Sequence, residues 1–453
     1  MARLARPPAT IAIALPVGTS VLPVVELTPA QVRGKRLRLT GKRREKADTS
    51  FGDSTSSMRI EALPLFHAAV KTELASKFTS GEAMRGAFAF AEMYGKKFVW
   101  KSDNFRIAKD PSFSLEDFAQ HGLAARVGEA VAYLKMLDLG YRYWDRCDVV
   151  WKRAAEALGA NHPGRLRSAA YIKARVRSGK PDVEPDFIFE KATREVALME
   201  AKGSFVSPEK DKPTTKPDLK HGLDQLDAWA NVIRPKPKKS YAIGTYLRQV
   251  GDQADPSFTA LVDPPSEGDP DAPVVDLPPD VIRKCNYGAW LGGMGLRAFA
   301  GALRVAPKTT TYEYVLPVVE KRGRRFLVVV LGVSRNKRTL FGASRDVWGL
   351  PFALSSQHWW EWQHRAWKRV RQHDQALVMG LELGTLRIVE EVLQNPDSDA
   401  LVTHGDLYED AESALKYDSP DFSVFPDGTC FGLVDRDAFS TDENLVQRVS
   451  LYP

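Results

Sequence analysis

The sequence PDFIFEKATREVALMEAK, residues 185–202, contains two short apolar runs, FIF and VALM, with a polar segment between them. This pattern is typical of two strands joined by a tight turn. Side chains alternate between the two faces of a strand, so Glu200 and Lys202 are predicted to lie on the same face. Asp186 stands where the first strand begins. The stretch therefore predicts a pair of carboxylates beside an ammonium group, which suits a divalent metal ion and a phosphate.

The same residues resemble the motif of the PD-(D/E)XK phosphodiesterase superfamily, which lies on a hairpin of this kind. The matching residues are Pro185-Asp186 and, after residues 187–199, Glu200-Ala201-Lys202. The resemblance covers roughly residues 115–250 and implies a restriction-endonuclease-like core, a mixed sheet flanked by helices. An earlier Pro-Asp pair offers Asp182 as an alternative, but a strand begins directly after Asp186.

The resemblance implies how the residues act. A hard metal ion, Mg²⁺ or Mn²⁺, would be bound by Asp186, Glu200 and the backbone carbonyl of Ala201. Lys202 would orient or deprotonate the attacking water, or stabilise developing negative charge.

A long apolar segment precedes the hairpin, and Ser114 is a good N-cap for a helix that begins at Leu115 and runs to Leu139. Its residues are apolar on nearly every face, which predicts a buried helix. In the resembled superfamily this helix often carries a glutamate that joins the metal site, and Glu129 matches that position. The alternative is that Glu129 reaches solvent or pairs with Lys135.

An amphipathic helix is predicted after the hairpin, at residues 219–233, followed by a strand at residues 241–247. Gln225 lies on that helix, and RecB-like branches of the superfamily place a substrate-site glutamine there. Those branches have a tyrosine four residues later, where this chain has Trp229. The order helix, hairpin, helix, strand predicts an α/β fold.

The chain has a formal net charge of +7 and a pI near 9.1, which favours an anionic partner such as nucleic acid. A basic run between Arg33 and Lys46 includes Lys42, Arg43 and Arg44, which we expect to contact phosphates. The alternative is a solvated arm or an exposed β-hairpin.

A basic helix is also predicted at residues 154–180, with Arg175 and Arg177 near its end. Placed just ahead of the acidic site, it would attract a substrate that the carboxylates repel. It can equally be an exposed helix face.

Composition changes along the chain predict its domains. They are a basic N-terminal region at 1–100, a nuclease domain at 101–262, a linker rich in proline and acid at 263–280, and a C-terminal α+β domain at 281–453. In the last domain, residues 348–371 mix tryptophans with basic residues, which suits base stacking. We favour the alternative of a helix that buries its tryptophans.

Three widely spaced cysteines, Cys147, Cys285 and Cys430, predict neither a disulfide framework nor a zinc site. No apolar run is long enough to span a bilayer. The N-terminal residues resemble a signal peptide, but prolines interrupt them, so we expect a cytoplasmic protein.

The sequence therefore favours a metal-dependent nuclease that hydrolyses phosphodiester bonds in DNA. One alternative is an inactive nucleic-acid-binding or regulatory protein that keeps the fold, and another is a nuclease toxin effector. A third hypothesis is an enzyme that acts on a small molecule, but no motif supports it. Defence against foreign DNA, repair and toxicity are all open as biological settings, and so are the oligomeric state and any partner protein.

Overall fold

The computed structural model describes residues 12–13, 18–33, 54–75, 98–99, 103–108, 117–157, 184–205, 216–251, 257–264, 274–304, 312–336, 339–341, 374–395, 398–403, 421–439 and 447–451. The chain divides into two compact units. The hairpin unit comprises Thr19–Ile60 and Lys97–Asn286, and the C-terminal unit comprises Met1–Gly18, Glu61–Lys96 and Tyr287–Pro453.

A mixed sheet forms the centre of the hairpin unit, in the strand order β3-β2-β11-β10-β8-β7-β6. Its strands are β2 (Thr19–Leu27), β3 (Ser56–Glu61), β6 (Tyr141–Arg146), β7 (Phe187–Lys191), β8 (Val196–Phe205), β10 (Lys239–Leu247) and β11 (Phe258–Val262). The pairs β2·β11 and β8·β10 are parallel, whereas β10·β11, β7·β8 and β6·β7 are antiparallel. Smaller pairs join β4 (Phe98–Val99) to β5 (Arg106–Ile107) and β9 (Ile233–Arg234) to β12 (Val275–Asp276).

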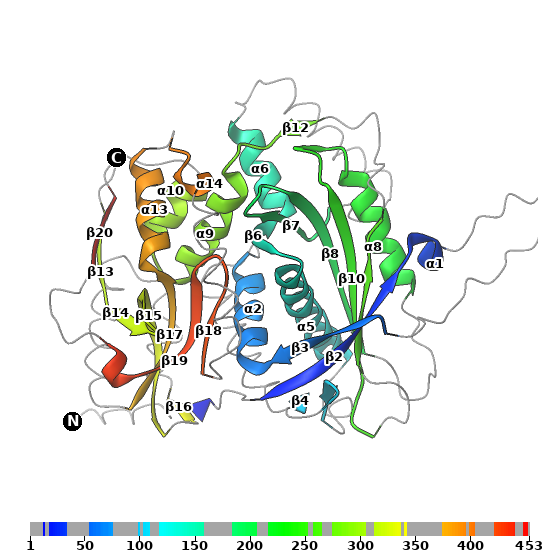
Figure 1. Ribbon diagram of the computed structural model, residues 1–453, viewed down its shortest axis with the longest axis horizontal. Helices are drawn as coiled ribbons and strands as arrows, with labels where there is room; N and C mark the ends of the chain where they lie inside the picture. Colours follow the sequence, from blue (N-terminus) through cyan, green and yellow to red (C-terminus); the bar gives the residue numbers. More distant parts are fainter. Residues whose placement is uncertain are drawn as a thin grey trace, which may run out of the picture. The chain divides into compact units, whose positions relative to one another are not determined.

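Two long helices, α5 (Asp117–Asp138) and α8 (Lys216–Trp229), pack on β8 and β10. They cover opposite faces of the sheet, as Figure 1 also shows. A Cβ atom built on Gly222 of α8 would lie 3.1 Å from Cγ of Glu200, whereas one built on Gly203 of β8 would lie 1.8 Å from the Ala124 carbonyl oxygen of α5. Residues 200 and 203 point to opposite faces by strand alternation. The shorter helices are α1 (Pro29–Arg33) and α6 (Cys147–Ala157).

The predicted hairpin is confirmed. The register of β7 and β8 pairs Phe187 with Met199, and the turn between them is closed by a 2.9 Å bond from Lys191 N to Glu195 O. Arg194 in this turn has φ 66°, in the left-handed region. The residues of both apolar runs, Phe187–Phe189 and Val196–Met199, are buried, which explains these runs.

The C-terminal unit has a second sheet, ordered β1-β16-β15-β17-β19-β18, with β14 also pairing with β15. Its strands are β1 (Ala12–Ile13), β14 (Val318–Lys321), β15 (Arg324–Asn336), β16 (Thr339–Phe341), β17 (Gln375–Glu382), β18 (Phe422–Val424) and β19 (Thr429–Asp435), while β13 (Tyr312–Leu316) pairs with β20 (Gln447–Leu451). Its helices are α2 (Ala62–Ala75), α10 (Arg297–Arg304), α13 (Leu383–Gln394), α14 (Ala400–Thr403) and the 3₁₀ helix Arg436–Ala438. The chain passes between the units within α9 (Val281–Gly293).

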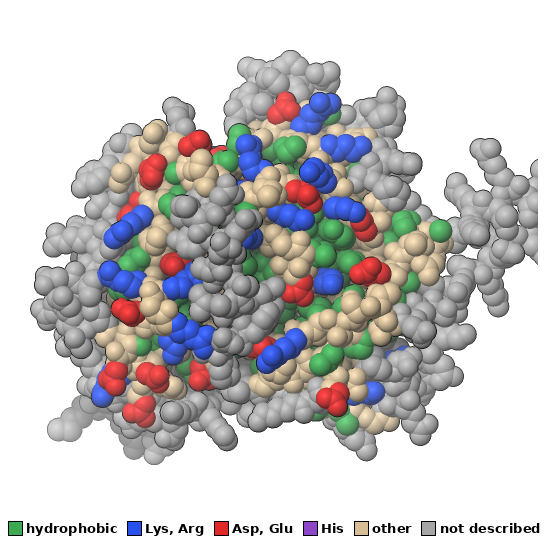
Figure 2. Space-filling view, viewed as in Figure 1, with side chains coloured by type: hydrophobic (Ala, Val, Ile, Leu, Met, Phe, Trp, Pro, Cys, Tyr) green, Lys and Arg blue, Asp and Glu red, His purple; other side chains and the backbone are tan. Residues whose placement is uncertain are grey.

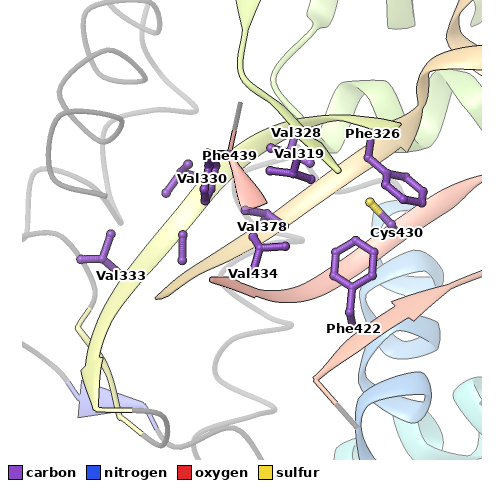
Figure 3. Close-up of a cluster of buried hydrophobic side chains, with 11 residues drawn as sticks. Val319, Phe326, Val328, Val330, Val333, Val378, Phe422, Cys430, Val434 and Phe439 are labelled. Atoms are coloured by element: carbon purple, nitrogen blue, oxygen red, sulfur yellow. The ribbon is translucent and has the colours of Figure 1, made fainter. Parts of the chain in front are cut away.

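Aliphatic and aromatic side chains of β14, β15, β17, β18 and β19 form a buried cluster on this sheet (Figure 3). Phe326 and Phe422 meet edge to face, with ring centroids 5.5 Å apart. The Trp290 indole donates a 2.8 Å hydrogen bond to the Gly380 carbonyl, so a buried polar group is satisfied. Among the helices that the structure describes, none is long and apolar enough to cross a membrane.

These observations confirm the α/β class. They also add strands of this sheet that the sequence analysis did not identify, namely β2, β3, β11 and β6, the last in the aromatic stretch that follows α5. The helix expected at 154–180 is α6, which begins earlier, at Cys147, and is described only to Ala157. Residues 158–183 lie outside the described part of the chain.

The two units also differ from the domains expected at 1–100, 101–262 and 281–453. Residues 19–60 belong with the hairpin unit because β2 pairs with β11, and α2 packs on β18 and β19 of the C-terminal unit. The end of the expected linker, Val275–Asp276, pairs with β9, while residues 265–273 lie outside the described residues.

A buried ion pair joins the start of α9 to β7. The Arg283 side chain is 0% exposed, and its Nε and Nη2 donate to Glu190 Oε1 and to the Ala192 carbonyl at 2.8 and 3.0 Å. The guanidinium also lies over the Tyr143 ring, 4.4 Å from its centroid. Burial raises the pKa of Glu190 to about 7, although the charge of Arg283 opposes this rise. The carboxylate therefore depends on this arginine to stay ionised.

We expect Arg283→Met to lower the free energy of unfolding of the hairpin unit by about 3 kcal/mol, because a buried carboxyl group loses its partner. Lys284→Met is the matched control, since Lys284 forms its ion pair with Asp280 in a more exposed position and should cost under about 1 kcal/mol. Urea unfolding measures both. Equal stability of R283M and K284M would contradict the assignment.

Candidate functional site

The candidate site lies where the ladder between β7 and β8 ends. Along an antiparallel ladder, every second pair of facing residues is hydrogen-bonded. The turn makes residues 191 and 195 such a pair, so by the register residues 187 and 199 are another. The next hydrogen-bonded pair would be residues 185 and 201. Pro185 has no N–H group, and the described strand β7 begins only at Phe187. The ladder bonds that β8 would next make are therefore interrupted.

Two carboxylates accept hydrogen bonds from backbone N–H groups at this interruption. Ala201 N donates to Asp186 Oδ2 at 3.0 Å, and Asp186 N donates to Glu200 Oε2 at 2.9 Å. The N–H and C=O of one residue point to the same side of a strand, so the Ala201 carbonyl faces the same gap as its N–H. Pro185 cannot donate to that carbonyl. Three oxygen-bearing groups thus meet at one interruption of the sheet.

The Lys202 ammonium contacts Glu200 Oε1, which confirms that both side chains lie on one face of β8. Glu200 is 1% exposed and Lys202 is 27% exposed, so the site is open to solvent on the lysine side. Burial alone would lower the pKa of Lys202, but the adjacent Glu200 carboxylate and the charge of Asp186 raise it. Lys202 is therefore an ammonium at neutral pH.

Both carboxyl groups are held in an unfavourable environment for negative charge. Burial, followed by the charge of Asp186, raises the pKa of Glu200 to about 8. Burial also raises the pKa of Asp186, although Lys202 and the hydrogen bond from Ala201 oppose this. A cation at this position would stabilise both carboxylates.

Helix α8 presents one face to the site. Gly222 lies against Glu200 with little space to spare, as described above. Asp218, one turn earlier, interacts electrostatically with Lys202, and Gln225, one turn later, donates from Nε2 to the Glu184 carbonyl at 3.2 Å. This hydrogen bond ties Gln225 to the segment that leads into Asp186.

Glu129 lies on α5, next to a close contact between that helix and β8. A Cβ atom on Gly128 would lie 2.8 Å from the Lys202 carbonyl oxygen. Glu129 is partly buried, and it interacts electrostatically with Arg146, which also interacts with Asp186. No group of three or more His, Cys, Asp or Glu side chains that could hold a metal ion is found among the described residues. The structure thus brings Asp186 and Glu200 together and places Glu129 nearby, on the helix that covers the strand.

Several predicted substrate-binding residues lie outside the described residues: Lys42, Arg43, Arg44, Arg175 and Arg177. The alternative Asp182 and the aromatic-basic block at 348–371 lie outside them as well. On the face shown in Figure 2, described Lys and Arg side chains are interspersed with Asp and Glu. The predicted basic surface for nucleic acid is therefore not assigned to any described patch on that face.

The sequence analysis missed Arg146, Asp148 and Asp218. Arg146 ends β6, an element that was not predicted, so nothing in the sequence placed it beside the hairpin. Asp218 lies one residue before the helix predicted at residues 219–233. Its spacing of seven residues from Gln225 puts both side chains on one helix face, so the sequence could have predicted that Asp218 faces the site.

Comparison with known proteins gave no matching family model, no similar curated protein and no similar solved structure. The interpretation of the site therefore depends on its own geometry.

The raised pKa of Glu200 predicts how stability changes with pH in the absence of metal ions. Unfolding returns the pKa to its ordinary value of 4.5, so the folded state binds a proton more tightly than the unfolded state. The contribution of Glu200 to the free energy of unfolding should therefore be greatest below pH 4.5. That contribution should be lost as the pH rises towards 8. We expect a loss on the order of 3 kcal/mol relative to Glu200→Gln.

Urea unfolding of both proteins in EDTA, from pH 5 to about pH 9, measures this difference. Glu195→Gln is the control, because Glu195 lies at the turn of the same hairpin and its pKa is lowered, through contacts with Lys191 and Tyr141 that outweigh burial. Parallel pH curves for the parent and E200Q would contradict the expected proton linkage.

Proposed function

We propose that this protein is a metal-dependent nuclease that hydrolyses phosphodiester bonds in DNA, with a restriction-endonuclease-like core. The observation that supports it best is the pair Asp186 and Glu200, held at an interruption of the β7–β8 ladder beside the Ala201 carbonyl and Lys202. The motif residues match the PD-(D/E)XK pattern in type, spacing and placement on a hairpin.

The donor set fits a hard divalent cation. Asp186, Glu200 and the carbonyl of Ala201 supply oxygen atoms only, which Mg²⁺ and Mn²⁺ prefer. Further carboxylates gather around this point, because Glu129 and Asp148 both interact with Arg146, which also interacts with Asp186. Bound there, such an ion would supply Lewis-acid polarisation of the phosphate and a lower pKa for water.

Hydrolysis forms one bond between a water oxygen and phosphorus and breaks one bond between phosphorus and a sugar oxygen. Overall, one proton of the water ends on the leaving oxygen, and the other stays on the new phosphate hydroxyl until the solvent removes it. The reaction needs a group that removes the first proton and a group that stabilises charge on the phosphate.

The structure favours one of the roles open to Lys202. Its raised pKa keeps it protonated at neutral pH, so it can donate a hydrogen bond to a phosphate oxygen or to the leaving oxygen, and it is a poor base. Glu200, which the ammonium contacts, is the neighbouring group that can accept a proton when it is ionised.

The decisive experiment incubates the purified chain with supercoiled DNA, linear DNA and RNA, each with Mg²⁺, Mn²⁺ or EDTA. We expect cleavage of DNA that requires the metal ion, and loss of at least about 100-fold in rate for Asp186→Asn and Glu200→Gln, because the ligand oxygens are lost while the shape is kept. Glu195→Gln should cleave like the parent. Binding without cleavage by the parent would favour the inactive nucleic-acid-binding alternative, and full activity of D186N and E200Q would refute the site.

A second prediction concerns Glu129. If its carboxylate joins or supports the metal site, Glu129→Gln should raise the Mg²⁺ concentration for half-maximal cleavage by about tenfold. Glu156→Gln on the exposed side of α6 serves as the control. A Mg²⁺ titration that is unchanged in E129Q would mean that Glu129 acts only on its neighbours, Arg146 among them.

A further inference from the structure

Arg146 ends β6 directly beside the candidate site. It is paired with Phe187 in the β6–β7 ladder, and the next residue, Cys147, donates from its backbone N to the Asp186 carbonyl at 3.2 Å. The Arg146 guanidinium lies over the Phe187 ring, 5.8 Å from the centroid. Its stem is thus fixed by packing next to the residue that precedes the strand β7.

Few of the N–H donors of the Arg146 guanidinium bond other described protein groups. Its Nε donates to Asp148 Oδ1 at 3.4 Å, and no other hydrogen bond of the guanidinium is found within the described part of the chain. The side chain is 28% exposed. Arg283, by contrast, is fully buried and bonds both a carboxylate and a backbone carbonyl. A guanidinium has five N–H donors, so Arg146 keeps donors for a group that comes from solvent.

The charges around Arg146 indicate what that group is. Arg146 interacts electrostatically with Asp186 and Glu129, and Asp148 lies beside it. These carboxylates would repel a phosphodiester, and the ammonium group of Lys202 on β8 is already paired with Glu200. A planar guanidinium is suited to binding two phosphate oxygens at once.

From this geometry we propose that Arg146 is a catalytic residue that binds the non-bridging oxygens of the scissile phosphate through its Nη groups. This inference rests on the proposed nuclease function and adds the residue that neutralises the substrate. As water attacks phosphorus and the sugar oxygen leaves, negative charge on the non-bridging oxygens changes, and a fixed guanidinium stabilises it without reorganisation.

The test uses the full chain with Arg146→Lys, Arg146→Ala and, as a control on the neighbouring helix α6, Arg153→Ala. Single-turnover cleavage of DNA in Mg²⁺ is measured for each, and Mn²⁺ affinity is measured directly without DNA. We expect R146A to cleave on the order of 100-fold more slowly, R146K to be intermediate, and R153A to match the parent. Mn²⁺ affinity should stay within about twofold of the parent, because Arg146 binds no metal ion. Added guanidinium ion, below denaturing concentrations, should restore part of the activity of R146A only.

The outcomes separate two failures. An active parent with an equally active R146A overturns the role of Arg146 and leaves the proposed function standing. An active parent whose R146A variant loses Mn²⁺ binding and cleavage together, without rescue by guanidinium, also overturns it, because Arg146 would then only organise the carboxylates. A parent that cleaves nothing refutes the proposed function and this role with it. If R146A fails to fold, R146K gives the same comparison.

Discussion

The hydrogen bonds that end the β7–β8 ladder determine the candidate site. Pro185 removes one backbone donor, and the carboxylates of Asp186 and Glu200 then accept from the N–H groups of Ala201 and Asp186. A carboxylate bonded to backbone N–H groups is held in one orientation, whereas a free side chain would sample several rotamers. The position of the two acidic side chains is therefore set by the main chain of the hairpin, and the helices on either side only complete the surroundings.

Electrostatics sets a second constraint on the same residues. Two buried carboxyl groups cannot both be ionised at low cost, so the metal-free site must hold protons, rely on Lys202, or both. Arg283 and Glu190 show the alternative arrangement a few residues away, where a fully enclosed arginine balances a single carboxylate. In the first arrangement the carboxyl groups outnumber the adjacent lysine, whereas in the second one arginine balances one carboxylate. This difference is the electrostatic reason for proposing a cation at the first pair and a purely structural role for the second.

Sequence patterns predicted the hairpin, the helix before it, the helix after it and strand β10, because each has a strong local signal. They also placed Glu200 and Lys202 on one face, since alternation is a local rule. They missed β6 and with it Arg146, because an aromatic run such as Tyr141–Trp144 is ambiguous until its ladder partner is known. Sequence patterns could not predict the pairing of β2 with β11 for a related reason. Nothing in the sequence near residues 19–27 indicates that its partner strand lies at residues 258–262.

That pairing affects how the protein folds as it is synthesised. Val24 faces Thr259 across the sheet, so β2 leaves the ribosome long before the strand beside it exists. Until then its edge, with the apolar sequence VLPVV, can pair with other chains, and the proline at position 23 limits such pairing because it offers no N–H. The described strands and helices from residue 117 to residue 247 contain Asp186, Glu200 and Lys202 and pack mostly on one another. They can therefore assemble before β11 is complete, and the N-terminal strand would join last, although it is made first.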